Sequence, residues 1–237
     1  MALGANGIIG VGLFQQDCGA ACTSQNQTIP DRYYSCPSSG CTHTYVTLQQ
    51  QLQNPVSVFA SDNNGVLIQL PAAPNGGSPT ASGSMIFGIG TRSNNALGSA
   101  NVYGVDGQGN FTTIFNNNTY SGSFIDSGSN GYFFPDSSIP TCSHPNEQWY
   151  CPTSSPDNLS AQNQGTNMSS PITVNFTIEA ASTLFNSSNT AFSTLGGPVP
   201  GNLNAFDWGR SFFYGKNVFT AIENKSTPGG TGPYFAY

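Results

Sequence analysis

Short runs rich in apolar, β-branched and aromatic residues recur along the chain, separated by polar stretches that favour turns. Such runs, bounded by Gly, Asn, Asp and Ser, are typical of β-strands. Asn64-Gly65 and Asp106-Gly107 have the composition of hairpin turns between two runs. The pattern therefore predicts a mostly β fold, a β-rich α+β class, with strands at 56–60, 65–70, 84–88, 100–105, 111–115, 123–126, 132–134 and 172–178.

Helical spacing is rare in the chain. Residues 45–53 place Val46, Leu48 and Leu52 among glutamines, and Asn54-Pro55 would end a helix there. The Gly-rich apolar residues 4–14 predict a buried strand and turn, and residues 15–44 form a Cys-rich loop region. No repeat of 20 to 50 residues is visible in the sequence.

The composition narrows the classes of function. Charged residues make up 7% of the chain and its formal net charge is −6, which disfavours nucleic acid or an anionic membrane surface as a partner. Hydrophobic residues, at 37%, are sufficient for a core. No apolar run approaches the roughly 18 residues of a membrane span. Because few groups titrate, we also expect the protein to tolerate acid.

The six cysteines form three close pairs along the sequence. Local disulfides are the favoured interpretation, although six cysteines allow about 15 pairings. Zinc is the alternative, but no cluster of acidic or His ligands surrounds Cys18, Cys22, Cys36 and Cys41 beyond His43. Disulfides indicate an oxidising compartment, so we expect a secreted, periplasmic or cell-envelope protein whose export signal was removed or lay further upstream. We expect no metal and no cofactor. The disulfide candidates are Cys18, Cys22, Cys36, Cys41, Cys142 and Cys151.

One segment has the composition of a catalytic site. In residues 123–129, Phe124 and Ile125 lead to Asp126 at the expected end of a strand, and Ser127, Gly128 and Ser129 follow. This order can hold a carboxylate rigidly and leave room for a water molecule and a substrate backbone. Taken alone, the same sequence is also a common turn.

Several blocks in order resemble the pepsin-like aspartic peptidases. Residues 123–129 match their second catalytic motif, and residues 7–12, GIIGVG, look like a hydrophobic-hydrophobic-Gly element. Residues 54–59 and 83–90 look like interlobe strands, and residues 206–209, FDWG, look like the second hydrophobic-hydrophobic-Gly element. Closer still, LGANGIIGVG, FIDSGSN, FDWG and VFTAIE resemble a bacterial family of unknown function built on this fold.

The resemblance implies a pepsin-like barrel lobe and peptide hydrolysis. Asp126 would be half of a carboxylate dyad, Ser127 and Ser129 supporting donors, and Gly128 a point of close backbone approach. Residues 1–44 would be a remnant of the N-terminal lobe with Cys-rich loops, and residues 45–237 the C-terminal lobe. The partner Asp would lie in the missing part of a longer parent, so we expect this chain to be inactive alone. Its partner would be a peptide or protein substrate.

Asp207 departs from the resemblance, because the family has an apolar residue there, and Arg210 stands where an Asp is usual. Two interpretations stay open. Asp207 faces solvent or caps a turn, or it approaches Asp126 as a possible second carboxylate so that the two charges interact.

Two further hypotheses about the function remain. The protein could be a non-catalytic envelope protein that uses this fold to bind peptide or polysaccharide, or to build structure. It could also be a homodimer that pairs Asp126 with its symmetry mate. The long Cys-rich N-terminal stretch favours a monomer over that homodimer.

Overall fold

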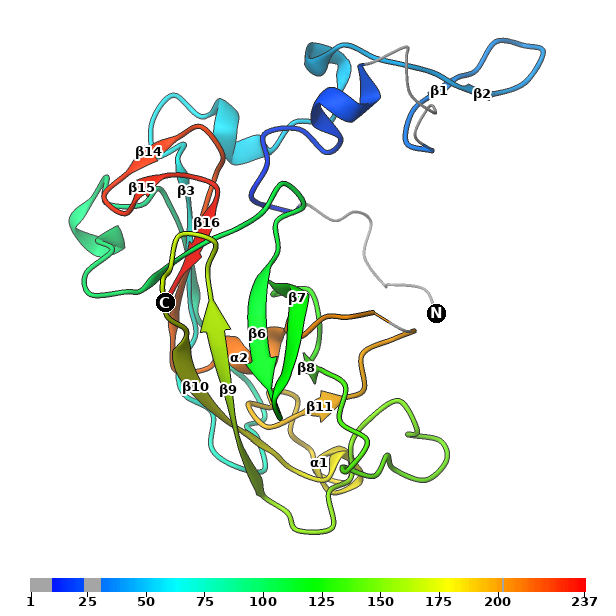
Figure 1. Ribbon diagram of the computed structural model, residues 1–237, viewed down its shortest axis with the longest axis vertical. Coiled ribbons are helices and arrows are strands. Elements are labelled where there is room, and N and C mark those ends of the chain that lie inside the picture. The colour runs from blue at the N-terminus through cyan, green and yellow to red at the C-terminus, as the bar shows by residue number, and fades with distance from the viewer. Residues whose placement is uncertain (1–9, 24–30, 202) are drawn as a thin grey trace.

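The computed structural model describes residues 10–23, 31–201 and 203–237, and most of its regular structure is β (Figure 1). Two larger sheets build the body of the molecule. The first has seven strands in the order β10-β9-β6-β7-β12-β8-β11 and is barrel-like and nearly closed. Its strands are β6 (Phe111–Phe115), β7 (Asn118–Ile125), β8 (Tyr132–Phe133), β9 (Asp157–Gln164), β10 (Ile172–Ile178), β11 (Gly196–Gly197) and β12 (Asp207–Trp208).

The second sheet has five antiparallel strands in the order β4-β3-β13-β16-β5. It joins segments from both halves of the chain, because the central β13 pairs with β3 on one side and with the C-terminal β16 on the other. Its strands are β3 (Gly65–Gln69), β4 (Ser84–Phe87), β5 (Val102–Gly104), β13 (Asn217–Ala221) and β16 (Tyr234–Ala236).

The main hydrophobic core is aromatic and takes side chains from both sheets. Phe206 and Trp208 stack with ring centroids 4.3 Å apart, and Phe134 stacks on Phe206 at 4.8 Å. Val218 and Phe235 of the five-stranded sheet pack into the same cluster. Large rings packed in this way supply much of the apolar burial that stabilises a chain with so few charges.

Short helices and two small hairpins complete the fold. The hairpin β1 (Tyr34–Ser35) and β2 (Thr42–His43) projects from the body, whereas β14 (Ser226–Thr227) and β15 (Gly230–Thr231) lie against it (Figure 1). The helices are α1 (Ala181–Phe185), α2 (Arg210–Phe213) and the 3-10 helices η1 (Gly19–Cys22), η2 (Leu48–Gln50), η3 (Pro55–Val58) and η4 (Ser93–Asn95). None of the helices in the described part of the chain has both the length and the apolar character to cross a membrane.

Two of the predicted elements were wrong. The strand expected at 56–60 is the 3-10 helix η3, because Pro55 occupies its first turn and the Asn54 side chain accepts a hydrogen bond from the Val56 N–H. The helix expected at 45–53 reduces to the three residues of η2, whose side chains bury no continuous apolar face. The interlobe strand that the resemblance implies at 54–59 is therefore absent from that described segment.

Other strands agree with the prediction or were missed. The predicted strands at 111–115 and 172–178 coincide with β6 and β10. Strand β9 was not predicted, because it is polar; it buries Ala161 and Asn163 and pairs along all of β10. The predicted strand-turn at 4–14 falls partly on residues 1–9, outside the described residues, and residues 10–14 hold no named strand.

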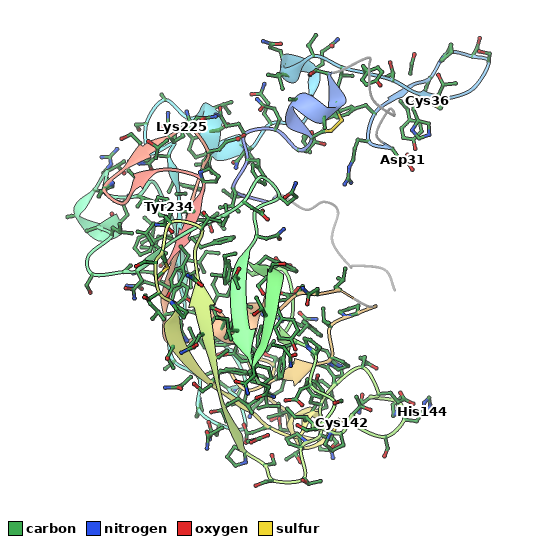
Figure 2. All side chains as sticks on the ribbon, viewed as in Figure 1. Asp31, Cys36, Cys142, His144, Lys225 and Tyr234 are labelled. Atoms are coloured by element: carbon green, nitrogen blue, oxygen red, sulfur yellow. A yellow bond between two sulfur atoms is a disulfide. The ribbon has the colours of Figure 1, made fainter. Side chains whose placement is uncertain are left out.

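The expected disulfides are present as three neighbour pairs. They join Cys18 to Cys22, Cys36 to Cys41 and Cys142 to Cys151. Figure 2 shows Cys36 on the projecting hairpin and Cys142 at the opposite end of the molecule. The zinc alternative is therefore wrong for these six cysteines, since each sulfur is bonded to another sulfur.

Candidate functional site

Asp126 follows the last residue of β7, and its backbone N–H continues the ladder by donating to the Trp208 carbonyl at 3.2 Å. The turn that follows satisfies both oxygens of its carboxyl group. The Gly128 N–H donates to Oδ1 at 2.8 Å, and the Ser129 hydroxyl donates to Oδ2 at 3.0 Å. The carboxyl group is therefore held in one orientation at the end of β7, where Ile125 is buried.

Strand β12 lies between the two strands that flank this turn. It pairs with β7 in parallel and with β8 in antiparallel orientation. Gly209, which follows β12, approaches the turn so closely that a Cβ there would lie 2.1 Å from the Gly131 carbonyl oxygen. The Arg210 N–H donates to the Ser129 carbonyl at 2.7 Å. The FDWG segment therefore packs against the Asp126 turn and holds it in place. Its last residue must be glycine, because the backbone of Gly131 approaches it so closely.

Asp207 is buried near this turn, with 6% of its surface exposed, so its side chain does not face solvent. The Ser129 hydroxyl, which donates to Asp126, lies near the Asp207 carboxyl group. Burial raises the pKa of Asp207 to about 7, the Ser129 contact acts in the opposite direction, and the charge of Asp126 raises the pKa further. Its Oδ1 is buried without a hydrogen-bond partner. The alternative interpretation, in which Asp207 approaches Asp126, stays a prediction, and the influence of the Asp126 charge on this pKa supports it.

A cavity of about 470 Å³ lies on the other side of Asp126. Asp126 and Ser127 line it together with residues 10–14 and with apolar side chains of the five-stranded sheet, among them Ile68 and Met85. Segments more than a hundred residues apart in the sequence therefore meet at one carboxylate. Residues 7–9 of the first hydrophobic-hydrophobic-Gly block lie outside the described residues, but its Gly10–Gly12 part reaches this cavity.

The predicted supporting residues differ in their contacts. Gly128 and Ser129 both bind the Asp126 carboxyl group. Ser127 lines the cavity and is exposed, and its hydroxyl forms no hydrogen bond within the described part of the chain. It is therefore free to meet a ligand, whereas the Ser129 hydroxyl is bound to the Asp126 carboxyl group.

One wall of the cavity was not predicted from the sequence. Gln108, Gly109 and Asn110 line it from the turn after Asp106, whose carboxyl group accepts the N–H groups of Gln108 and Asn110. The Asp106-Gly107 pair predicted that turn but did not indicate that the residues after it line a cavity. Within the described ranges, no three His, Cys, Asp or Glu side chains are grouped so as to hold a metal ion.

Comparisons with known proteins identify one matching family. No curated protein matches the chain. One family profile, described as "Protein of unknown function (DUF3443)", matches residues 1–237. The match spans the whole length of the chain, from the Gly-rich start through the Asp126 turn and the FDWG segment to the C-terminal strand. The chain therefore belongs to the DUF3443 family of proteins of unknown function.

Proposed function

We propose that this chain forms the C-terminal, Asp126-bearing part of an aspartic-peptidase-like protein with a pepsin-like fold. The observation that carries the proposal is the meeting of three segments at one place. The Asp126 turn and the start of the chain near Gly10 line the cavity, and the FDWG segment packs against the Asp126 turn. These are the segments on which the resemblance to the pepsin-like peptidases rests.

The geometry suits a carboxylate that acts on a water molecule. Asp126 is fixed by two hydrogen bonds, is partly exposed and borders a cavity with both polar and apolar walls. An ionised carboxylate so placed can accept a proton from water as a general base. The apolar side chains of Ile68, Met85 and Phe213 would contact substrate side chains, and the exposed Ser127 hydroxyl would contact the substrate backbone.

Hydrolysis by this mechanism requires a second carboxylate, which polarises the scissile carbonyl while the first activates water. Among the residues that line the cavity, Asp126 is the one acidic side chain. The proposal therefore includes a partner carboxylate contributed by a preceding segment of a longer protein, and the 237 residues alone would not cleave peptides.

The decisive experiment assays the protein together with its upstream coding segment. We expect cleavage of unfolded protein substrates at acid pH that pepstatin inhibits. Asp126→Asn should lower kcat/KM at least about 100-fold, because it removes the group that takes the proton from water. Asp31→Asn, on the projecting hairpin (Figure 2), is the matched control and should retain full activity.

Full activity in Asp126→Asn, or an upstream segment that contains no Asp-Thr-Gly or Asp-Ser-Gly motif, would exclude the peptidase. A non-catalytic peptide-binding protein of the cell envelope is the second candidate, and the single acidic side chain in the cavity favours it. In that case, peptides would bind to the isolated chain and Asp126→Asn would leave them uncleaved and still bound.

The proposed location is outside the cytoplasm. Three disulfides fit an extracellular or otherwise oxidising environment. Secretion or retention in the periplasm or envelope is the finer assignment that we propose, and fractionation of the native host with an antibody to the chain would test it.

A further inference from the structure

A second cavity, of about 280 Å³, lies at the end of the body that carries α1 and Cys142 (Figure 2). It shares no lining residue with the Asp126 cavity. Its walls combine aromatic rings with one guanidinium group, and no acidic side chain is among the described residues that line it. The residues that give it this character are Asn130, Trp149, Phe185, Phe192 and Arg210.

The aromatic rings follow one another along the wall. Trp149 and Phe185 meet edge to face with ring centroids 5.7 Å apart, and Phe185 meets Phe192 in the same manner at 6.2 Å. Phe185, the last residue of α1, is 38% exposed. Because aromatic rings gain from further edge-on and offset contacts, such an open wall suits another flat apolar ring.

The wall is supported by buried contacts. Trp149 and Phe192 pack against the hydrophobic cluster that contains the buried side chains of α1. The buried Ser211 hydroxyl lies 2.8 Å from the Phe192 carbonyl oxygen and 3.0 Å from that of Leu195. Ser211 follows Arg210 directly, so α2 ties the aromatic wall to the guanidinium group. A cavity with walls fixed in this way loses little conformational freedom when a ligand binds.

Arg210 brings the positive charge of this cavity. Its backbone N–H donates to the Ser129 carbonyl at 2.7 Å, and its Nη2 donates to Asn130 Oδ1 at 2.7 Å. Within the described ranges, Arg210 forms no ion pair with an acidic side chain. A guanidinium group has five N–H donors and binds a carboxylate through two parallel hydrogen bonds. The exposed Arg210 side chain therefore has donors left for an anionic ligand.

The charge and the size of the cavity narrow the class of ligand. Aromatic walls alone would also suit a cation, but the guanidinium group of Arg210 repels one. A volume of about 280 Å³ is at the lower end for small-molecule sites, so it suits a single ring and not a nucleotide or a lipid chain.

We propose that this cavity binds a carboxylate carried on a single aromatic ring. The ring of the ligand lies against Phe185 and its neighbours, and the carboxylate binds the guanidinium group of Arg210. A free aromatic acid and the C-terminal aromatic residue of a peptide share this chemistry. The site is separate from Asp126 and does not rest on the proposed peptidase activity.

The test uses the 237-residue chain and two probes, N-acetylphenylalanine and its amide, which differ only in the carboxylate. NMR of the ¹⁵N-labelled indole groups of Trp149 and Trp208 follows binding. We expect the acid to shift the signal of Trp149, which lines the cavity, and not that of Trp208, which is fully buried in the main core. The amide should bind at least about tenfold more weakly, because it cannot form the charged pair of hydrogen bonds.

Three variants assign the contacts. Arg210→Gln retains a donor for Asn130 but removes the charge, so it should weaken binding of the acid at least about tenfold, to the level of the amide. Phe185→Ala, at an exposed ring, should weaken binding of both probes. Arg32→Gln, at an exposed arginine outside the cavity, is the matched control and should bind the acid as the wild type does.

A short peptide that ends in phenylalanine and 3-phenylpropionate distinguish the two sources of the carboxylate, since the natural source is the one that binds more tightly. The proposal is overturned if the acid and the amide bind equally well, or if the acid at millimolar concentration leaves the Trp149 signal unshifted. Full affinity of Arg210→Gln for the acid would also overturn it.

Discussion

Asp207 is an ionisable residue at a position of β12 where the alternation of side chains along a strand predicts exposure to water. Phe206 and Trp208 point into the aromatic core, so the residue between them faces the opposite side of β12. That side is covered by the Asp126 turn, and the pKa of Asp207 is raised to about 7 mainly by burial. A carboxyl group in this position is neutral in acid and becomes costly when it ionises.

The sign of this effect on stability follows from linkage. Because the pKa of Asp207 rises from 3.8 to about 7 on folding, the folded state holds the proton more tightly. Its contribution is complete below pH 3.8 and is lost as the pH rises through 7. We expect the free energy of unfolding to fall by up to about 4 kcal/mol across this range from Asp207 alone.

Asp207→Asn should flatten this part of the stability profile, as measured by urea unfolding at a series of pH values. Asp31→Asn, at an exposed residue, should keep the wild-type slope. An equal slope in Asp207→Asn and in the wild type would contradict the assignment of the raised pKa to this residue.

At the scale of elements, β12 is tied to its neighbours by a buried polar network. The Trp208 Nε1–H donates to the Thr113 hydroxyl at 3.1 Å, and Thr113 donates to Asn163 Oδ1 at 2.8 Å. The Asn163 amide then donates to the Tyr237 hydroxyl at 2.9 Å. These hydrogen bonds link β12, β6, β9 and the C-terminus within the core. They therefore hold in place the strand that supports the Asp126 turn.

Thr113→Val should break this network while keeping the side-chain shape. Because the Trp208 N–H and the Asn163 carbonyl would each lose a buried partner, we expect a loss of about 2 to 4 kcal/mol in the free energy of unfolding. Thr113→Ser retains the hydroxyl and should lose about 1 kcal/mol, the value of one buried methyl group. Chemical denaturation measures both, and a valine variant as stable as the serine variant would contradict a role for the network.

The whole molecule is stabilised by aromatic packing and covalent links, with few ion pairs. Within the described part of the chain, the ion pairs are His43–Asp31, Arg92–Asp62 and His144–Glu147. The Cys142–Cys151 bond closes a loop in the body of the molecule. These two cysteines pack with Leu184 and Leu195. The Cys36–Cys41 bond instead closes the exposed tip of the projecting hairpin (Figure 2).

Removal of these two disulfides should therefore have unequal effects. Replacing Cys142 and Cys151 by serine should lower the free energy of unfolding of the body by about 2 to 3 kcal/mol, because the loop gains freedom in the unfolded chain. The same change at Cys36 and Cys41 should alter the main unfolding transition by less than about 0.5 kcal/mol. Differential scanning calorimetry distinguishes the two, and equal destabilisation would show that the hairpin folds with the body.

Much of the site was predictable from local sequence. The two residues before Asp126 are apolar and the turn after it is Ser-Gly-Ser. The chain therefore ends the strand, turns and binds its own carboxylate through neighbours two and three residues further on. The neighbour pairing of cysteines is also confirmed, since each pair is close in sequence. Family membership is confirmed at the level of a family of unknown function.

The sequence by itself determined the β-rich class, the disulfides and the Asp126 turn, because these depend on neighbours a few residues apart. Only the tertiary structure decided the state of Asp207, the polar strand β9 and the Gln108–Asn110 wall of the cavity. Each of these depends on a segment far away in the sequence that covers it, pairs with it or faces it. Strand β9, for example, pairs with the distant β6 as well as with the next strand, β10. Burial sets the charge of Asp207, and burial is a property of the assembled fold.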